Sequence, residues 1–265
     1  MTVRAALIDI DGTLCAGERL IPGGAEAILA LRDLTIAVRL TTNIDSRPPQ
    51  AVFEQLRTLG LDVRASEVFT PVVAALRLLG RPSCSVYPLV SAAVLPLFEP
   101  FDAGAPYSHV LVGDCRDRLS YVRLDEAFRA VRAGAELIAL QRGRYFKRDD
   151  GDHVDAGALV AGLEYSTGVQ ARLLGKPHPD FFKLALDGTG IAASETIVVG
   201  DDLSSDVAGG HGVGATTVLV RTGKYADNAG RAADARADHV IDSIAGLPVL
   251  LAQLGRFDDH QPEPL

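Results

Sequence analysis

The stretch Asp9-Ile10-Asp11-Gly12-Thr13-Leu14 stands at the end of an apolar run over residues 3–10, which predicts a buried strand. Two carboxylates one residue apart, at the carboxyl end of a parallel strand, point into the crevice where open α/β sheets bind ligands. Gly12 permits the turn that brings backbone N–H groups towards an anion. An ordinary acidic turn after a strand is the alternative, and motifs elsewhere in the chain are needed to distinguish it from a ligand-binding site.

The two ends of the chain predict one sheet. Short runs rich in Val, Ile and Leu alternate there with longer segments of helical period, the pattern of strand-helix-strand units in a parallel sheet. We expect strands at 3–10, 36–42, 196–200 and 216–220, and helices at 24–34, 49–59 and 179–187. The fold class is therefore α/β, with a doubly wound, Rossmann-like parallel sheet.

The middle of the chain predicts a separate insert of strands and helices. Strands are expected at 83–89, 109–112 and 136–140, a helix at 124–133, and a hairpin in which 145–147 and 153–154 flank Asp149-Asp150-Gly151-Asp152. Glycine and proline near residues 80 and 174 mark where the insert leaves and re-enters the sheet. We expect a core domain over 1–79 and 175–265, and an inserted domain over 80–174.

Composition excludes several classes of protein. With 265 residues, one large or two unequal domains are expected. The 26 Lys and Arg against 34 Asp and Glu argue against attraction to nucleic acid or to an anionic membrane surface. The longest uncharged stretch, 83–98, is shorter than the roughly 20 residues of a membrane-spanning helix. Three scattered cysteines without a CxxC pair indicate a reducing cytoplasm.

Polar side chains suited to binding or catalysis also stand at the ends of other predicted elements. The second predicted strand ends in Thr42 and Asn43, at the same sheet edge as the two aspartates. Lys176 precedes a predicted helix, where its ammonium can reach the crevice and neutralise a phosphate or a carboxylate cluster. Each has an ordinary alternative, since Thr and Asn often cap helices and most lysines are exposed.

Three more acids follow the strand predicted at 196–200: Asp201, Asp202 and Asp206. Helix capping explains one of them but not three. Bringing these acids beside Asp9 and Asp11 would be costly without a cation, because like charges a few Å apart raise each other's pKa. Ligation by oxygen alone favours a hard ion, and Mg²⁺ before any transition metal.

Together these motifs resemble the four motifs of the haloacid dehalogenase (HAD) superfamily: Asp-Ile-Asp-Gly-Thr, Thr-Asn, Gly-Lys-Pro and Gly-Asp-Asp with a further Asp. The insert is similar to the α/β cap of the p-nitrophenylphosphatase-like branch. Residues 143–147, 200–210 and 220–225 are similar to the phospholysine/phosphohistidine/inorganic pyrophosphate phosphatase subgroup.

The resemblance implies a Mg²⁺-dependent phosphatase that hydrolyses small phosphorylated metabolites through an aspartyl-phosphate. Asp9 would be the nucleophile, and the metal would be held by the Asp9 carboxylate, the Asp11 carbonyl and the Asp201 carboxylate. Asp202 and Asp206 would hold metal-bound water or Lys176.

The remaining roles follow from the same resemblance. Thr42 and the Asn43 backbone N–H would hold the phosphoryl group, and Lys176 would offset its charge. The Asp11 side chain would be the general acid and base. Some close relatives in the subgroup carry Ser at this position, so the resemblance favours a phosphomonoester over a phosphoramidate as substrate.

Substrate choice would fall to the insert, with Arg144, Tyr145 and Lys147 on the predicted hairpin as contacts; a solvated charged hairpin is the alternative. A homodimer formed through the cap is a further expectation. Two other functions use the same residues: a phosphomutase or phosphotransferase, and a signalling or binding protein that accepts phosphate on aspartate. Receiver domains are about half as long and order their acids differently.

Overall fold

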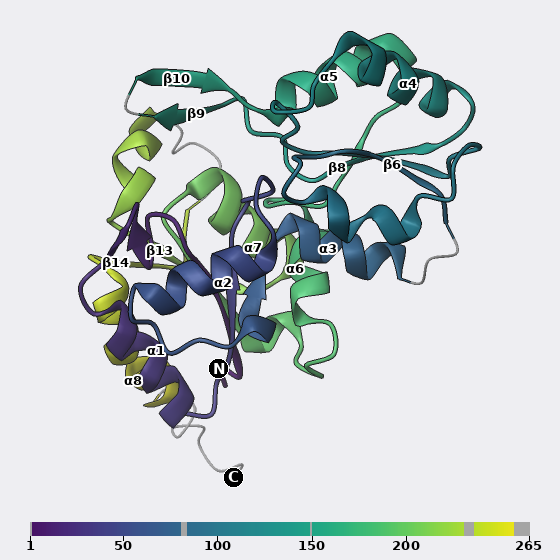
Figure 1. Cartoon of the computed structure of the whole chain (residues 1–265). Coiled ribbons are helices and arrows are strands. Elements are labelled where there is room, and N and C mark those ends of the chain that lie inside the picture. The colour runs from purple at the N-terminus through teal and green to yellow at the C-terminus, as the bar shows by residue number, and fades with distance from the viewer. Residues whose placement is uncertain (1, 81–83, 149, 231–235, 257–265) are drawn as a thin grey trace. The chain divides into compact units, whose positions relative to one another are not determined.

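The computed structural model describes residues 2–80, 84–148, 150–230 and 236–256. Their chain divides into two compact units (Figure 1). The first unit lies within 1–42, 52–69 and 176–265, and the second within 43–51 and 70–175. The boundaries expected from the sequence differ from this division in assigning 43–51, 70–79 and 175 to the core.

Six parallel strands form the sheet of the first unit, in the order β14-β13-β12-β1-β4-β5. β1 (Ala5–Asp9) pairs with β12 (Thr196–Gly200) on one side and with β4 (Ala37–Thr41) on the other, and every residue of β1 and β12 is buried. The outer strands are β13 (Thr216–Val220), β14 (His239–Ile241) and β5 (Val68–Phe69). Successive strands are added outwards in both directions from β1, so the predicted doubly wound α/β fold is confirmed.

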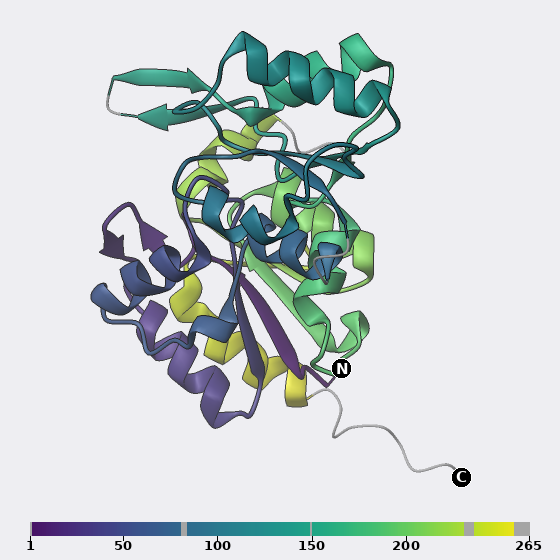
Figure 2. The same ribbon diagram turned by 45° about the vertical axis from the view of Figure 1, so that its right-hand side comes forward.

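Helices cover both faces of this sheet. α1 (Gly24–Asp33) packs with α8 (Leu247–Arg256) on one face, and α6 (Pro179–Leu186) with α7 (Ala208–Val213) on the other (Figure 2). α2 (Pro49–Thr58) connects β4 to β5, and the short β2 (Cys15–Ala16) and β3 (Arg19–Leu20) follow β1. Because both faces are covered, the central strands β1 and β12 are mostly apolar.

The second unit contains a smaller parallel sheet, in the order β11-β8-β7-β6. Its strands are β6 (Val86–Leu89), β7 (His109–Val112), β8 (Glu136–Ala139) and β11 (Arg172–Leu173). Its helices are α3 (Pro71–Leu79), α4 (Tyr121–Arg132) and α5 (Ala156–Thr167). β9 (Tyr145–Arg148) and β10 (Gly151–Val154) pair as an antiparallel hairpin.

The unit thus has the α/β character expected of the insert. Among the helices of the described ranges, none is both long and apolar enough to cross a membrane.

Candidate active site

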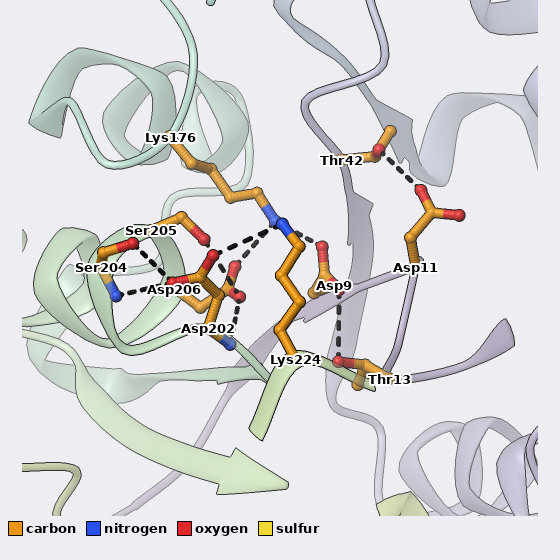
Figure 3. A network of polar contacts seen from close by, with 10 residues as sticks. All are labelled: Asp9, Asp11, Thr13, Thr42, Lys176, Asp202, Ser204, Ser205, Asp206 and Lys224. Carbon is orange, nitrogen blue, oxygen red and sulfur yellow. Dashed lines mark hydrogen bonds and ion pairs between the residues drawn. The ribbon is translucent and has the colours of Figure 1, made fainter. Parts of the chain in front are cut away.

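The turn after β1 brings the first acidic motif to the carboxyl edge of the sheet (Figure 3). Asp9 is the last residue of β1 and is 6% exposed, whereas Asp11 is exposed. The buried hydroxyl of Thr13 donates to Asp9 Oδ2 at 3.2 Å. Gly12 has a φ of 91°, and a Cβ there would lie 2.0 Å from Asp201 Oδ2. Glycine is therefore required both for the turn and for the close approach of Asp201.

The end of β4 places Thr42, of the second motif, beside the first motif. Asp9 pairs in register with Thr41, and Thr42 follows directly. The Thr42 hydroxyl, 2% exposed as a residue, donates to Asp11 Oδ2 at 3.3 Å. Asn43, the other predicted residue of this motif, belongs to the second unit.

Lys176 is the buried cation of the site. Its Nζ lies 2.5 Å from Asp9 Oδ1 and 2.7 Å from Asp206 Oδ1, and its side chain is 3% exposed. Burial lowers the pKa of Lys176, but Asp206 and Asp9 more than reverse this effect, and the pKa is raised overall. Lys176 is thus held in its charged form, and it joins two acids that are far apart in the sequence.

Asp9, Asp201 and Asp206 form one buried cluster, with carboxylate oxygens within 4.8 Å of one another. Burial raises the pKa of Asp9 well above its usual value, and the lowering effect of Lys176 does not cancel this. Burial likewise raises the pKa of Asp201 to about 6, against the hydrogen bond from the Lys224 backbone. Crowded carboxylates raise each other's pKa, a bound cation would relieve this repulsion, and their oxygens are the ligands that Mg²⁺ prefers.

Asp202 lies next in the chain but has different partners. Its Oδ1 accepts from the Ser204 backbone N–H at 2.8 Å and from the Ser204 hydroxyl at 2.6 Å. Its Oδ2 lies 3.4 Å from Lys224 Nζ. The structure therefore places Asp206 against Lys176, and Asp202 against Ser204 and Lys224.

A turn to which the sequence motifs assign no role orients Asp201. The backbone N–H of Lys224 donates to Asp201 Oδ2 at 2.6 Å, and the Thr222 hydroxyl donates to the Gly12 carbonyl at 2.5 Å. A Cβ on Gly223, which has a φ of 56°, would lie 2.0 Å from Asp201 Oδ2. The available signal was positional, since this turn follows the apolar strand β13 at the same sheet edge.

The remaining predicted contacts lie in the second unit. Arg144 precedes β9 and is exposed, and Tyr145, the first residue of β9, is 50% exposed. The backbone of Lys147 is part of β9, but its side chain lies outside what the structure describes. The structure brings together the acids and Lys176 of the first unit, and it places the hairpin residues in a different unit.

Comparisons with known proteins agree with this arrangement. A Haloacid dehalogenase-like hydrolase model matches residues 6–102, and a HAD-hydrolase-like model matches 173–247. The Homo sapiens protein named Haloacid dehalogenase-like hydrolase domain-containing protein 2 is 38% identical over 223 residues, covering 84% of this chain and 86% of that protein. The Danio rerio phospholysine phosphohistidine inorganic pyrophosphate phosphatase is 35% identical over 251 residues, 92% of each chain.

Solved structures extend the likeness to three dimensions. The p-nitrophenyl phosphatase from Archaeoglobus fulgidus superposes with a TM-score of 0.85 and 26% identity, over 94% of this chain and 100% of that one. NagD from E. coli K-12 superposes with a TM-score of 0.83 and 27% identity, over 92% and 98%.

This chain belongs to the haloacid dehalogenase-like hydrolases. It is an enzyme of the phosphatase class within that family, acting on phosphorylated substrates. The family resemblance, the fold class and the enzyme class expected from the sequence are therefore confirmed.

Proposed function

We propose that this chain is a Mg²⁺-dependent phosphatase of small phosphorylated metabolites, with Asp9 as the nucleophile. The observation that carries the proposal is the position of Lys176 Nζ, 2.5 Å from Asp9 and 2.7 Å from Asp206, inside a buried cluster that also contains Asp201. A buried acid fixed by a cation and by the Thr13 hydroxyl is oriented for in-line attack on phosphorus.

In the first step a carboxylate oxygen of Asp9 forms a bond to phosphorus, and the bond from phosphorus to the leaving oxygen breaks. Asp11, in its protonated form, gives its proton to that oxygen. The Thr42 hydroxyl, 3.3 Å from Asp11 Oδ2, orients this acid, and we expect it to donate to a phosphoryl oxygen of the bound substrate. Lys176 offsets the negative charge that accumulates beside Asp9.

In the second step Asp11 takes a proton from water, and the resulting hydroxide attacks the aspartyl-phosphate. The bond between phosphorus and Asp9 breaks, which releases inorganic phosphate and restores the carboxylate. Asp9, Asp201 and the Asp11 backbone carbonyl would hold Mg²⁺, which supplies screening of the repulsion between carboxylate and phosphate. Asp206 holds Lys176 in place throughout.

The substrate specificity is proposed to depend on the second unit, through Arg144, Tyr145 and Lys147. The support is the exposure of Arg144, directly before β9, and of Tyr145, its first residue. The preference for a phosphomonoester rests on Asp11, whose carboxyl group can protonate the leaving oxygen so that it departs as an alcohol. A cytoplasmic location and a homodimer remain predictions from the sequence.

The test is phosphate release from p-nitrophenyl phosphate by the full chain with Mg²⁺. Asp9→Asn should remove turnover, whereas Asp33→Asn, an exposed acid at the end of α1, should retain it. EDTA should stop the reaction, and added Mg²⁺ should restore it. Activity that survives in Asp9→Asn contradicts the proposed nucleophile, and indifference to EDTA contradicts the metal.

A panel of phosphorylated sugars, nucleotides, pyridoxal phosphate, pyrophosphate and phosphohistidine then identifies the substrate class.

A further inference from the structure

The β9–β10 hairpin is closed at its base by buried polar groups. The Gln141 side chain, 4% exposed as a residue, donates through Nε2 to Asp155 Oδ1 at 2.7 Å and accepts from the Gly143 backbone N–H. Asp155 Oδ1 also accepts from the Ala156 N–H at 2.8 Å, where α5 begins. A Cβ on Gly143 would lie 2.1 Å from Asp155 Oδ2. The base of the hairpin is therefore fixed to the start of α5.

A second attachment holds the strands of the hairpin themselves. The Arg116 guanidinium lies over the Phe146 ring of β9, with 4.1 Å between Cζ and the ring centroid. The same ring stacks on the imidazole of His153, its paired residue on β10, with centroids 5.4 Å apart. A guanidinium over an aromatic ring is attracted by the negative charge of the ring face. Arg116 therefore attaches both strands of the hairpin to the segment that follows β7.

The Arg116 guanidinium is itself fixed by the carboxylate of Asp114. Its Nε lies 2.9 Å from Asp114 Oδ1, and its Nη2 lies 2.7 Å from Asp114 Oδ2, a bidentate pair that fixes the plane of the guanidinium. The Asp114 backbone N–H donates to Oδ2 of the buried Asp45 at 3.0 Å. Asp45 follows Asn43 by two positions. We call these five residues the hairpin network: Asp45, Asp114, Arg116, Phe146 and His153.

The hairpin network decides where the predicted substrate contacts point. Successive side chains of a strand lie on opposite faces, so a Phe146 ring held against Arg116 turns the neighbouring Tyr145 to the other face. Tyr145 is 50% exposed there. The Arg116 side chain is 40% exposed and lies outside the hydrophobic core, so its loss should leave the unit folded.

We propose that Arg116 is a positioning residue for substrate recognition: by holding Phe146, it orients the β9–β10 hairpin and so sets the affinity for the leaving group. This inference rests on the proposed function, in which substrate specificity depends on Arg144, Tyr145 and Lys147. It assigns Arg116 no part in phosphoryl transfer, which belongs to the acids of the first unit.

The test compares KM, kcat and inhibition by inorganic phosphate, with p-nitrophenyl phosphate as substrate and Mg²⁺ present. Arg116→Ala should raise KM about tenfold, as expected for the loss of a cation–π contact and the order it imposes. The kcat and the inhibition constant of phosphate should stay within about twofold, because phosphate lacks the leaving group. Arg116→Lys, which keeps the charge without the planar guanidinium, should have a KM between those of the wild type and Arg116→Ala.

Two further variants make the test specific. Phe146→Leu should raise KM as Arg116→Ala does, and the double variant should be no worse than either single variant, since all three remove one contact. Arg129→Ala is the matched control, because it removes the same charge from a 77% exposed arginine on α4 that pairs with Asp125. This control should leave KM unchanged.

The outcomes separate the two proposals. If the wild-type chain releases no phosphate from p-nitrophenyl phosphate or from the substrate panel, the proposed function is wrong and this role falls with it. If the wild type is active but Arg116→Ala has an unchanged KM, only the positioning role is overturned. A parallel rise in KM and in the inhibition constant of phosphate also overturns it, because the effect then acts on the phosphate site.

Discussion

Two acids, one in each unit, are equally buried but meet opposite surroundings. In the first unit Asp9, 6% exposed, lies 2.5 Å from Lys176 Nζ. In the second unit Asp45, 4% exposed, accepts the backbone N–H of Asp114, and the charged side chains that act on it are those of Asp155 and Asp114, both acids. Burial, followed by these acidic neighbours, raises the pKa of Asp45 to about 7.

The difference shows what a buried carboxylate can be used for. A carboxylate beside a fixed cation is oriented by it, and the cation opposes the rise in pKa that burial causes. A carboxylate held by backbone N–H groups among other acids takes up a proton near neutral pH. The first arrangement suits a nucleophile, and the second suits a structural contact that responds to pH.

The largest effect is expected from removing the cation of the first unit. Lys176→Met should lower kcat by about 10³-fold, because the charge that orients Asp9 and offsets the transferred phosphoryl group is lost. Lys183→Met, an exposed lysine on α6, is the control and should remain active. A Lys176→Met enzyme within about tenfold of the wild type would mean that burial alone, without the cation, prepares the site.

A smaller loss should follow from changing the proposed acid. Asp11→Asn should lower kcat by about 10²-fold with an alkyl phosphate and by less with p-nitrophenyl phosphate, whose leaving group is a weaker base and needs a proton less. Inhibition by inorganic phosphate should persist. Equal losses with the two substrates would remove Asp11 as the group that protonates the leaving oxygen.

In the second unit the sensitive quantity is the free energy of unfolding. Because the pKa of Asp45 is raised in the folded chain, its neutral form is favoured there, and stability is highest below the ordinary value of 3.8 and falls as pH rises through about 7. Asp45→Asn keeps an acceptor for the Asp114 N–H and loses this dependence. Between pH 4 and pH 8 the free energy of unfolding of the variant should rise by up to about 4 kcal/mol relative to that of the wild type.

Urea unfolding at a series of pH values measures this difference. The matched control is Asp152→Asn, an exposed acid on the hairpin, which should follow the wild type at every pH. If the difference in the free energy of unfolding between Asp45→Asn and the wild type does not change with pH, Asp45 stays ionised in the folded chain.

The smallest effect tests the turn that orients Asp201. Gly223→Ala should weaken activation by Mg²⁺ about tenfold, because its Cβ would displace a carboxylate that is proposed to hold the metal. Gly214→Ala is a matched control, since Gly214 has a φ of 78° with nothing within 4 Å of the added Cβ. It should cost stability alone. Equal activation constants in the two variants would show that backbone strain, not the Asp201 contact, matters at Gly223.

Strands were predictable where a single apolar run marks them in the sequence. β7, β12 and β13 have the bounds expected from their apolar runs. α4 begins three residues earlier than expected, at Tyr121, because the Ser120 hydroxyl accepts the Arg123 N–H and caps the helix. α3 was missed, although Thr70 before Pro71 is a helix-start signal whose hydroxyl accepts from Val73 N–H.

The candidate site was predictable to a similar degree. Asp9, Asp201 and Asp206 each stand at or after a strand end, and parallel strands align those ends, so their meeting follows from local pattern. The Lys224 N–H on Asp201 and the Asp45 contact with Asp114 were missed. Neither leaves a periodic or compositional trace, because each joins segments that only packing brings together.

Local patterns are sufficient to predict the α/β class and the carboxyl edge at which the acids gather, because apolar periodicity can be read from a short stretch of residues. The position of Lys176 between Asp9 and Asp206, residues 167 and 30 positions away from it, depends on the folded chain. The distance between such groups depends on how the segment before α6 packs against β1 and on the turn after β12. That packing is a sum of many contacts, and no single stretch of residues encodes it.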